Sequence, residues 1–233
     1  MKIEKIIISI LFIMIFVVSL YGKGNWLKPL EINSFPEFFE KVHIGMKSED
    51  VIKALDGRFK LIPADSEAIG YKDLNLFWND NFVDILYNKI EYSTSFLFYK
   101  DILFQINSLK YLYIYKDKTR GEKTEYSDYE NIINDFKNDS KYIYLLEEKF
   151  KPIDQSGYRS SVTVNMCHFK IDDKVITIKF VEEIYNDNIK NLQKYYMLSI
   201  FQFPFIIYED IKNSESDKKY EVLEQFVNSY LKQ

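Results

Sequence analysis

The chain has a single cysteine, Cys167, in 233 residues. One cysteine cannot form an intramolecular disulfide, so packing and hydrogen bonds must hold the fold even in an oxidising compartment. A bacterial lipoprotein carries its lipid on a cysteine that directly follows the apolar leader, and residues 1–30 contain none. We therefore expect no lipid anchor.

Glycine is also scarce, with seven residues in the chain. Loops that bind nucleotide phosphates use closely spaced glycines, and the sequence has neither such a loop nor the G-x-S-x-G turn of serine hydrolases. The formal net charge is -4, with acidic and basic residues interspersed. Because a nucleic-acid site needs a basic face, we expect neither nucleotides nor nucleic acids as ligands.

The leader is the clearest signal that is present. Residues 6–20 carry no charge and directly follow Lys2, Glu4 and Lys5. A short basic start and an apolar segment of this length predict a signal peptide over residues 1–22 and an exported protein in the periplasm, the cell envelope or the medium. No A-x-A cleavage site is present, so the alternative is an uncleaved leader that attaches the chain to a membrane.

The Cys, His and acidic residues, which most often act in catalysis or bind metals, do not form a recognised catalytic or metal-binding motif. Cys167 and His168 are neighbours on a predicted strand, so their side chains should point to opposite faces, and only His43 remains as a partner for the thiol. We expect Cys167 to be buried and His168 to lie at the surface. The acidic pairs at 172–173 and 182–183 face apart for the same reason, and no spacing matches a metal site. The sequence therefore predicts no catalytic, cofactor-binding or metal-binding residue and no cofactor.

The first half of the mature chain predicts two helices followed by a sheet. An S-x-x-E capping box begins at Ser34, and a second helix should run from Ser48 to Gly57, where glycine can adopt the left-handed closing conformation. Aromatic and β-branched residues then predict strands over 74–115. These elements define a predicted first unit over residues 33–115.

The same order recurs after a polar stretch at 116–123 that reads as a linker. A capping box at Ser127 predicts one helix, and apolar spacing over residues 142–150 predicts another. Strands are then expected up to residue 208. These elements define a predicted second unit over residues 125–208.

A closing helix is expected over residues 216–231, because its apolar side chains fall on one stripe that should dock on the rest of the protein. That stripe consists of Tyr220, Leu223, Phe226, Val227, Tyr230 and Leu231. Polar pairs at 100–101 and 172–173 predict tight turns between strands. The predicted fold class is α+β, with helical hairpins packed on antiparallel sheets, in two degenerate units of two helices and a sheet, and a C-terminal helix.

Two short segments resemble a known group of exported proteins. The segment HIGMKSEDV at 43–51, followed by Leu55 and Gly57, resembles the G-M-x-x-x-x-V-x-x-x-L-G opening of modules with the β-lactamase-inhibitor-protein-like fold, which includes assembly lipoproteins of the SmpA/OmlA type. The segment LEEKFKP at 146–152 is similar to the L-x-x-K-Y-G-x-P phrase of envelope proteins that pair such helices with a sheet. The resemblance implies a two-layer unit of helices on an antiparallel sheet that binds another macromolecule.

These observations lead to two hypotheses about function. The first is an exported, non-enzymatic protein that binds a protein or a component of the cell envelope, at a surface that the sequence does not locate. The second is an exported hydrolase of an unrecognised family that uses dispersed Asp, Glu and Tyr residues. A pocket with converging carboxylates would favour the enzyme, whereas a broad aromatic patch beside the sheet would favour binding.

Overall fold

The computed structural model describes residues 28–64, 75–115, 119–121, 125–151, 159–185, 192–205 and 219–231. Its main feature is one sheet of eleven strands with the order β1-β4-β5-β6-β11-β10-β9-β8, in which β2 pairs with β3, β3 pairs with β5, and β7 pairs with β6. The strands are β1 (Leu30–Ile32), β2 (Leu61–Pro63), β3 (Leu76–Asn79), β4 (Val83–Tyr87), β5 (Ile90–Tyr99), β6 (Ile102–Tyr115), β7 (Thr119–Gly121), β8 (Ile143–Phe150), β9 (Arg159–Ile171), β10 (Lys174–Tyr185) and β11 (Leu192–Pro204). The sheet is mixed because β1 pairs with β4 in parallel, while the other pairs are antiparallel.

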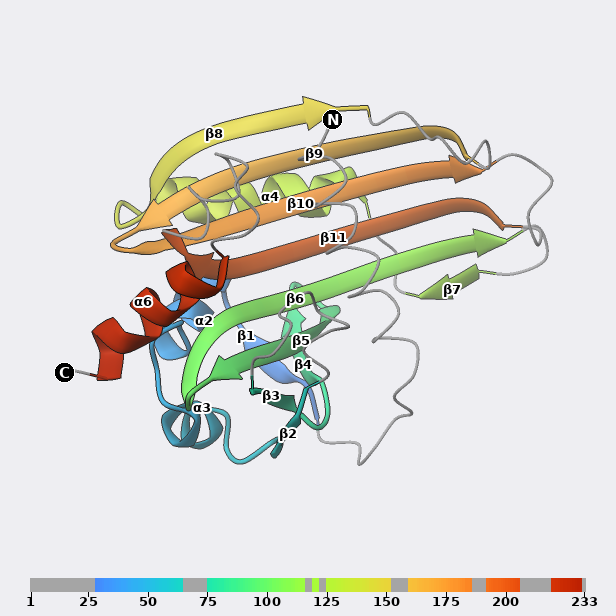
Figure 1. The fold of residues 1–233 in the computed structure, drawn as a ribbon. Coiled ribbons are helices and arrows are strands. Elements are labelled where there is room, and N and C mark those ends of the chain that lie inside the picture. The colour runs from blue at the N-terminus through green and yellow to red at the C-terminus, as the bar shows by residue number, and fades with distance from the viewer. Residues whose placement is uncertain are drawn as a thin grey trace.

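Four helices accompany the sheet in the described ranges (Figure 1): α2 (Phe35–Lys41), α3 (Ser48–Ala54), α4 (Tyr126–Asn138) and α6 (Lys219–Leu231). None of these helices is long and apolar enough to cross a membrane. The predicted leader at residues 1–22 lies outside the described residues, so export stays a prediction.

The predicted pair of helices near the N-terminus is confirmed. The Ser34 hydroxyl caps α2 by accepting a hydrogen bond from the Glu37 amide at 3.2 Å. The second helix, α3, ends at Ala54, and Gly57 follows with φ +69° and an amide that donates to the Ile52 carbonyl at 2.8 Å. Glycine closes this helix as expected, because a left-handed backbone there carries no Cβ penalty.

The two predicted tight turns are also confirmed. Lys100 and Asp101 connect β5 to β6 with φ +48° and +68°, and Asp172 lies between β9 and β10 with φ +51°. The consecutive positive φ values of Lys100 and Asp101 match the right-handed twist of the flanking strands. The sequence therefore located both hairpins correctly.

The prediction of a helix over residues 142–150 is wrong, because this segment is strand β8, paired with β9. A register shift between Tyr144 and Leu146 marks a bulge in β8. A bulge adds one residue to a strand and moves the apolar positions after it to the other parity. Residues 142, 145, 146 and 150 then take the three- and four-residue spacing that indicates a helix.

The predicted fold class is therefore wrong in its central point. In the described ranges the structure is one large mixed sheet with four short helices, rather than helical hairpins packed on separate sheets. Strand β6 from the first half pairs with β11 from the second half, from Leu192 opposite Tyr115 to Gln202 opposite Ile106. Pairing these long strands removes two exposed sheet edges, which explains why the halves share a sheet.

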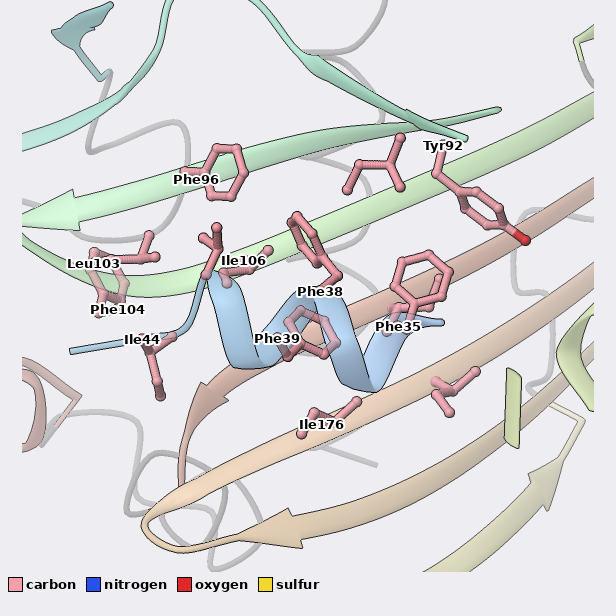
Figure 2. Packing of buried hydrophobic residues seen from close by; sticks show 14 of the residues in the cluster. Phe35, Phe38, Phe39, Ile44, Tyr92, Phe96, Leu103, Phe104, Ile106 and Ile176 are labelled. Carbon is pink, nitrogen blue, oxygen red and sulfur yellow. The ribbon is translucent and has the colours of Figure 1, made fainter. Parts of the chain in front are cut away.

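The larger hydrophobic core lies between the helices and one face of the sheet, here called the helix face (Figures 1 and 2). Figure 2 shows Phe35, Phe38 and Phe39 of α2 among side chains from the strands. The Phe35 ring meets the Tyr92 ring edge-on with centroids 5.2 Å apart, as is usual for buried aromatic pairs. Each of these buried rings contributes about 2–3 kcal/mol of hydrophobic free energy.

The prediction that the closing helix docks is confirmed for α6. Leu223 and Val227 are fully buried in the larger core, and Phe226 is 5% exposed. At the helix end, the Tyr230 hydroxyl donates to a carboxylate oxygen of Asp173 at 2.8 Å. The predicted cap at residue 216 lies outside the described residues.

Gly45 provides a test of how tightly α6 is docked. Its backbone has φ +91°, and a Cβ at this position would lie 2.5 Å from Cζ of Tyr230. Gly45→Ala is therefore expected to lower the free energy of unfolding by about 2–4 kcal/mol, through backbone strain plus overlap with the ring. Urea denaturation measures this loss.

The matched control for this substitution is Gly57→Ala. Gly57 has a similar positive φ of +69°, but no atom lies within 4 Å of the added Cβ. This variant should lose only the backbone contribution, about 1 kcal/mol. Equal losses in the two variants would show that the contact with Tyr230 does not hold α6 in place.

Candidate functional site

The sheet face opposite the helices, here called the second face, carries its own hydrophobic cluster. Every buried member of that cluster comes from a strand, whereas the larger core includes buried side chains from each of α2, α3, α4 and α6. The cluster consists of Leu109, Val162, Val164, Met166, Val181, Tyr195 and Met197, with Tyr111, Tyr113, Phe150 and Tyr185 packed against it. Apolar residues thus occupy both faces of the central strands, which is unusual for an antiparallel sheet.

Polar groups lie beside this cluster on neighbouring strands. His168 and Thr177 are opposite each other on β9 and β10, and His168 Nδ1 lies 2.8 Å from Thr177 Oγ1. The other ring nitrogen, Nε2, lies 3.7 Å from a carboxylate oxygen of Glu148 on β8. The expectation that His168 lies at the surface is wrong, because it is only 5% exposed. We call His168 and Thr177 the histidine row.

The prediction for Cys167 is confirmed. Its side chain is fully buried in the larger core, on the face opposite His168. Burial, with a contribution from Glu147, raises the pKa of the Cys167 thiol to about 12. A thiol with this pKa is protonated at neutral pH and is not a nucleophile. In the described residues no hydrogen bond joins it to His43, whose Nδ1 lies 2.9 Å from the Ile44 carbonyl oxygen.

The next row of the second face contains a buried lysine. Lys179 of β10 is opposite Met166 on β9 and Ser199 on β11, and Ser199 is opposite Leu109 on β6. We call these four residues the lysine row. Lys179 is 4% exposed and Ser199 is fully buried. Burial lowers the pKa of the Lys179 amine to about 7, while Glu183 on the same strand acts in the opposite direction.

This pKa predicts a pH dependence of stability that Lys179→Met should abolish. Because the folded-state pKa of about 7 lies below the ordinary value of 10.5, the unfolded chain binds one more proton between these two pH values. Stability that comes from this group therefore rises as pH increases from about 7 to 10.5, by at most about 1.4 kcal/mol per pH unit. The measurement is the difference in unfolding free energy between wild type and variant at pH 7.5 and 9.5.

All other titratable groups are the same in the two proteins, so taking the difference removes, to first order, the pH dependence that does not come from Lys179. A difference that stays constant between the two pH values would show that the Lys179 amine is not desolvated.

The row after the lysine row is apolar. Val164, Val181, Met197 and Tyr111 are opposite one another on β9, β10, β11 and β6, and we call them the valine row. Beyond it, the rings of Tyr113 and Tyr195 lie 4.6 Å apart between centroids. The second face therefore changes from polar to apolar to aromatic along the strands.

Carboxylates and metal ligands do not gather in the described part of the chain. No group of three or more His, Cys, Asp or Glu residues there has the geometry to hold a metal ion. Several acidic side chains have structural partners instead, such as Asp128 with Lys110, Asp135 with Tyr87 and Asp173 with Tyr230.

Sequence reasoning did not find the second face. A usable signal was present in β10, where Thr177 and Lys179 lie two residues apart in the otherwise apolar stretch from Val175 to Val181. Polar residues at period two within an apolar run indicate one face that is not purely a core.

Comparison with protein-family models, with curated proteins and with solved structures finds no match to this chain. The resemblance of residues 43–57 to β-lactamase-inhibitor-protein-like modules therefore stays an expectation from sequence.

Proposed function

We propose that the chain is an exported, non-enzymatic protein that binds a component of the cell envelope on the second face of its sheet. The observation that carries this proposal is the hydrophobic cluster on that face, which consists of strand residues while the buried parts of the described helices pack on the other face. The members of this cluster are 2–7% exposed, and none of the described helices contributes a side chain to it, so we take this face to be one that a ligand or partner can cover.

The side chains of this face support the proposal further. The cluster includes Met166 and Met197, and methionine, a flexible side chain, is enriched at binding surfaces, as is tyrosine. Tyr111 and Tyr113, with ring centroids 5.3 Å apart, are half-buried and present aromatic area at its margin. Export is supported by the basic and apolar pattern of residues 1–22.

Site-specific cross-linking tests this function. A photoreactive benzoyl-phenylalanine replaces Tyr111 on the second face, or Tyr126 of α4, which is 40% exposed and contacts Phe180 on the helix face. After irradiation of cells that make the full chain, we expect an adduct with an envelope component from position 111 and none from position 126. Adducts from both positions in equal yield, or from neither, would contradict the proposal.

One observation favours hydrolysis as a second candidate function. Thr177, His168 and Glu148 present a hydroxyl, an imidazole and a carboxylate in the order used by hydrolases, with separations of 2.8 and 3.7 Å. Hydrolysis of a chromogenic ester that disappears in His168→Gln, with thermal unfolding unchanged, would support this alternative. The residues differ from the dispersed Asp, Glu and Tyr set that the sequence suggested.

A further inference from the structure

Lys179 is a buried amine on the second face of the sheet. Its side chain is 4% exposed, and in the described ranges it forms no hydrogen bond or ion pair. Glu183, four residues farther along β10, acts on it only through space. Buried charges in proteins are usually paired, so the protonated form of Lys179, which burial disfavours, would be stabilised by an anion in contact with it, and no described residue supplies one.

Ser199, next to Lys179, also carries a buried polar group without a partner among the described residues. Its Oγ is buried and has no hydrogen-bond partner in the described residues. Because Ser199 is opposite Lys179 on the neighbouring strand, both side chains point to the second face next to each other. Buried polar atoms are nearly always hydrogen-bonded in native structures. Two adjacent donors without an acceptor among the described residues therefore favour a site for an external acceptor.

The surroundings of this pair are polar on one side and apolar on the other. The histidine row lies two residues before Lys179 along β10, and the valine row lies two residues after it. Successive rows on one face are about 7 Å apart. Val181 and Met197 are 4% and 2% exposed, so a ligand whose charged end meets Lys179 would have its alkyl chain among buried apolar side chains, towards the Tyr113 and Tyr195 rings.

We propose that Lys179 and Ser199 bind the anionic headgroup of a ligand whose alkyl chain lies along the valine row. This inference rests on the proposed function, because it uses the same face and names the chemical class of the envelope component. A fatty-acid carboxylate and the phosphate of a lipid share this chemistry. Both accept hydrogen bonds from an ammonium group and a hydroxyl.

The test measures binding of dodecanoate, dodecyl phosphate and dodecanol to the full chain by isothermal titration calorimetry at pH 6.5. Each probe is used at a concentration below its critical micelle concentration or solubility limit. We expect at least one of the two anions to bind more tightly than dodecanol, and the preferred anion identifies the headgroup. Lys179→Met should weaken binding of that anion by about tenfold to a hundredfold, as is typical when a hydrogen bond to a charged group is lost. Binding of dodecanol should stay unchanged, because methionine preserves the apolar contacts.

Two further variants make the test specific. Ser199→Ala removes the second donor without a large change in volume and should weaken binding of the anion by about threefold to tenfold. Lys174→Met removes a positive charge from the start of the same strand, where the amine lies 3.7 Å from Asp173, and should leave binding unchanged. Far-ultraviolet circular dichroism and thermal unfolding establish that each variant is folded.

The outcomes separate this inference from the proposed function. Wild-type affinity for the anions in Lys179→Met, or equal affinity of the wild type for dodecanol and the anions, overturns the headgroup site. Absence of binding for all three probes, together with an adduct from position 111, overturns the alkyl ligand while the proposed binding face stands. Absence of both binding and adduct overturns both.

Discussion

Leu223→Asp is expected to lower the free energy of unfolding by about 3–5 kcal/mol, because it places a carboxylate in the hydrophobic core and removes a packed side chain. Leu223 is fully buried, and its helix also contributes Phe226 and Val227 to the same core. Urea denaturation followed by circular dichroism measures the loss.

The control is the same substitution at Leu231 on the same helix. Leu231 is 50% exposed, so Leu231→Asp should change stability by about 0.5 kcal/mol or less. A stable Leu223→Asp protein would mean that α6 is not part of the folded core. If that stable variant also lost cross-linking from position 111, the stripe of α6 would belong to the binding surface.

Asp128→Ala is expected to lower the free energy of unfolding by a similar amount, because it leaves the buried Lys110 without its ion-pair partner. The side chain of Lys110 on β6 is fully buried, and its Nζ lies 3.0 Å from Asp128 Oδ2 at the first turn of α4. The same oxygen accepts a hydrogen bond from the Glu125 amide at 3.0 Å and completes the cap of the helix. Removing this carboxylate leaves a buried charge unpaired and should cost about 3–5 kcal/mol.

The reverse substitution should be much milder. Lys110→Met leaves Asp128 partly exposed at a helix N-terminus, where a carboxylate remains favourable, so we expect a loss of about 1 kcal/mol or less. Adding Lys110→Met to Asp128→Ala should restore most of the stability, and only the loss of the cap should remain, at about 1 kcal/mol. Equal losses in the two single variants would contradict an energetic role for the buried lysine. Chemical denaturation of all three variants gives the coupling free energy between the two residues.

Local features were predictable wherever a few neighbouring residues decide the structure. Ser34 caps α2 because its hydroxyl reaches an amide three residues later, and Gly57 closes α3 because only its own backbone is involved. The turn at Lys100 and Asp101 followed from polar residues between two apolar strands. In each case the physical cause lies within about five residues of sequence.

The fold as a whole was less predictable because partners far apart in sequence decide it. The spacing of Tyr142, Leu145 and Leu146 favoured a helix, but backbone hydrogen bonds to β9 and a bulge made the segment a strand. Likewise, nothing near β6 in the sequence indicates that it pairs with β11. The two helical units expected from the sequence therefore became halves of one sheet.

The candidate site was hidden for the same reason. Lys179, Ser199 and Met166 are each unremarkable in sequence, and they form a row only when three strands align in register. The single visible clue was the polar pair Thr177 and Lys179 in an apolar strand. The sequence predicted a surface position for His168 because no motif links it to Thr177. The two residues become neighbours only when β9 and β10 pair as a hairpin.

The pairing of β6 with β11 has a consequence for how the chain reaches its native state. Ile106 and Gln202 are paired in the sheet although they are 96 positions apart in sequence. Contacts between residues so distant impose a large loop-closure entropy and slow the search for the native topology. During synthesis, one edge of β6 stays unpaired until β11 has been made, so the chain is exposed to aggregation through that edge until its last long strand is complete.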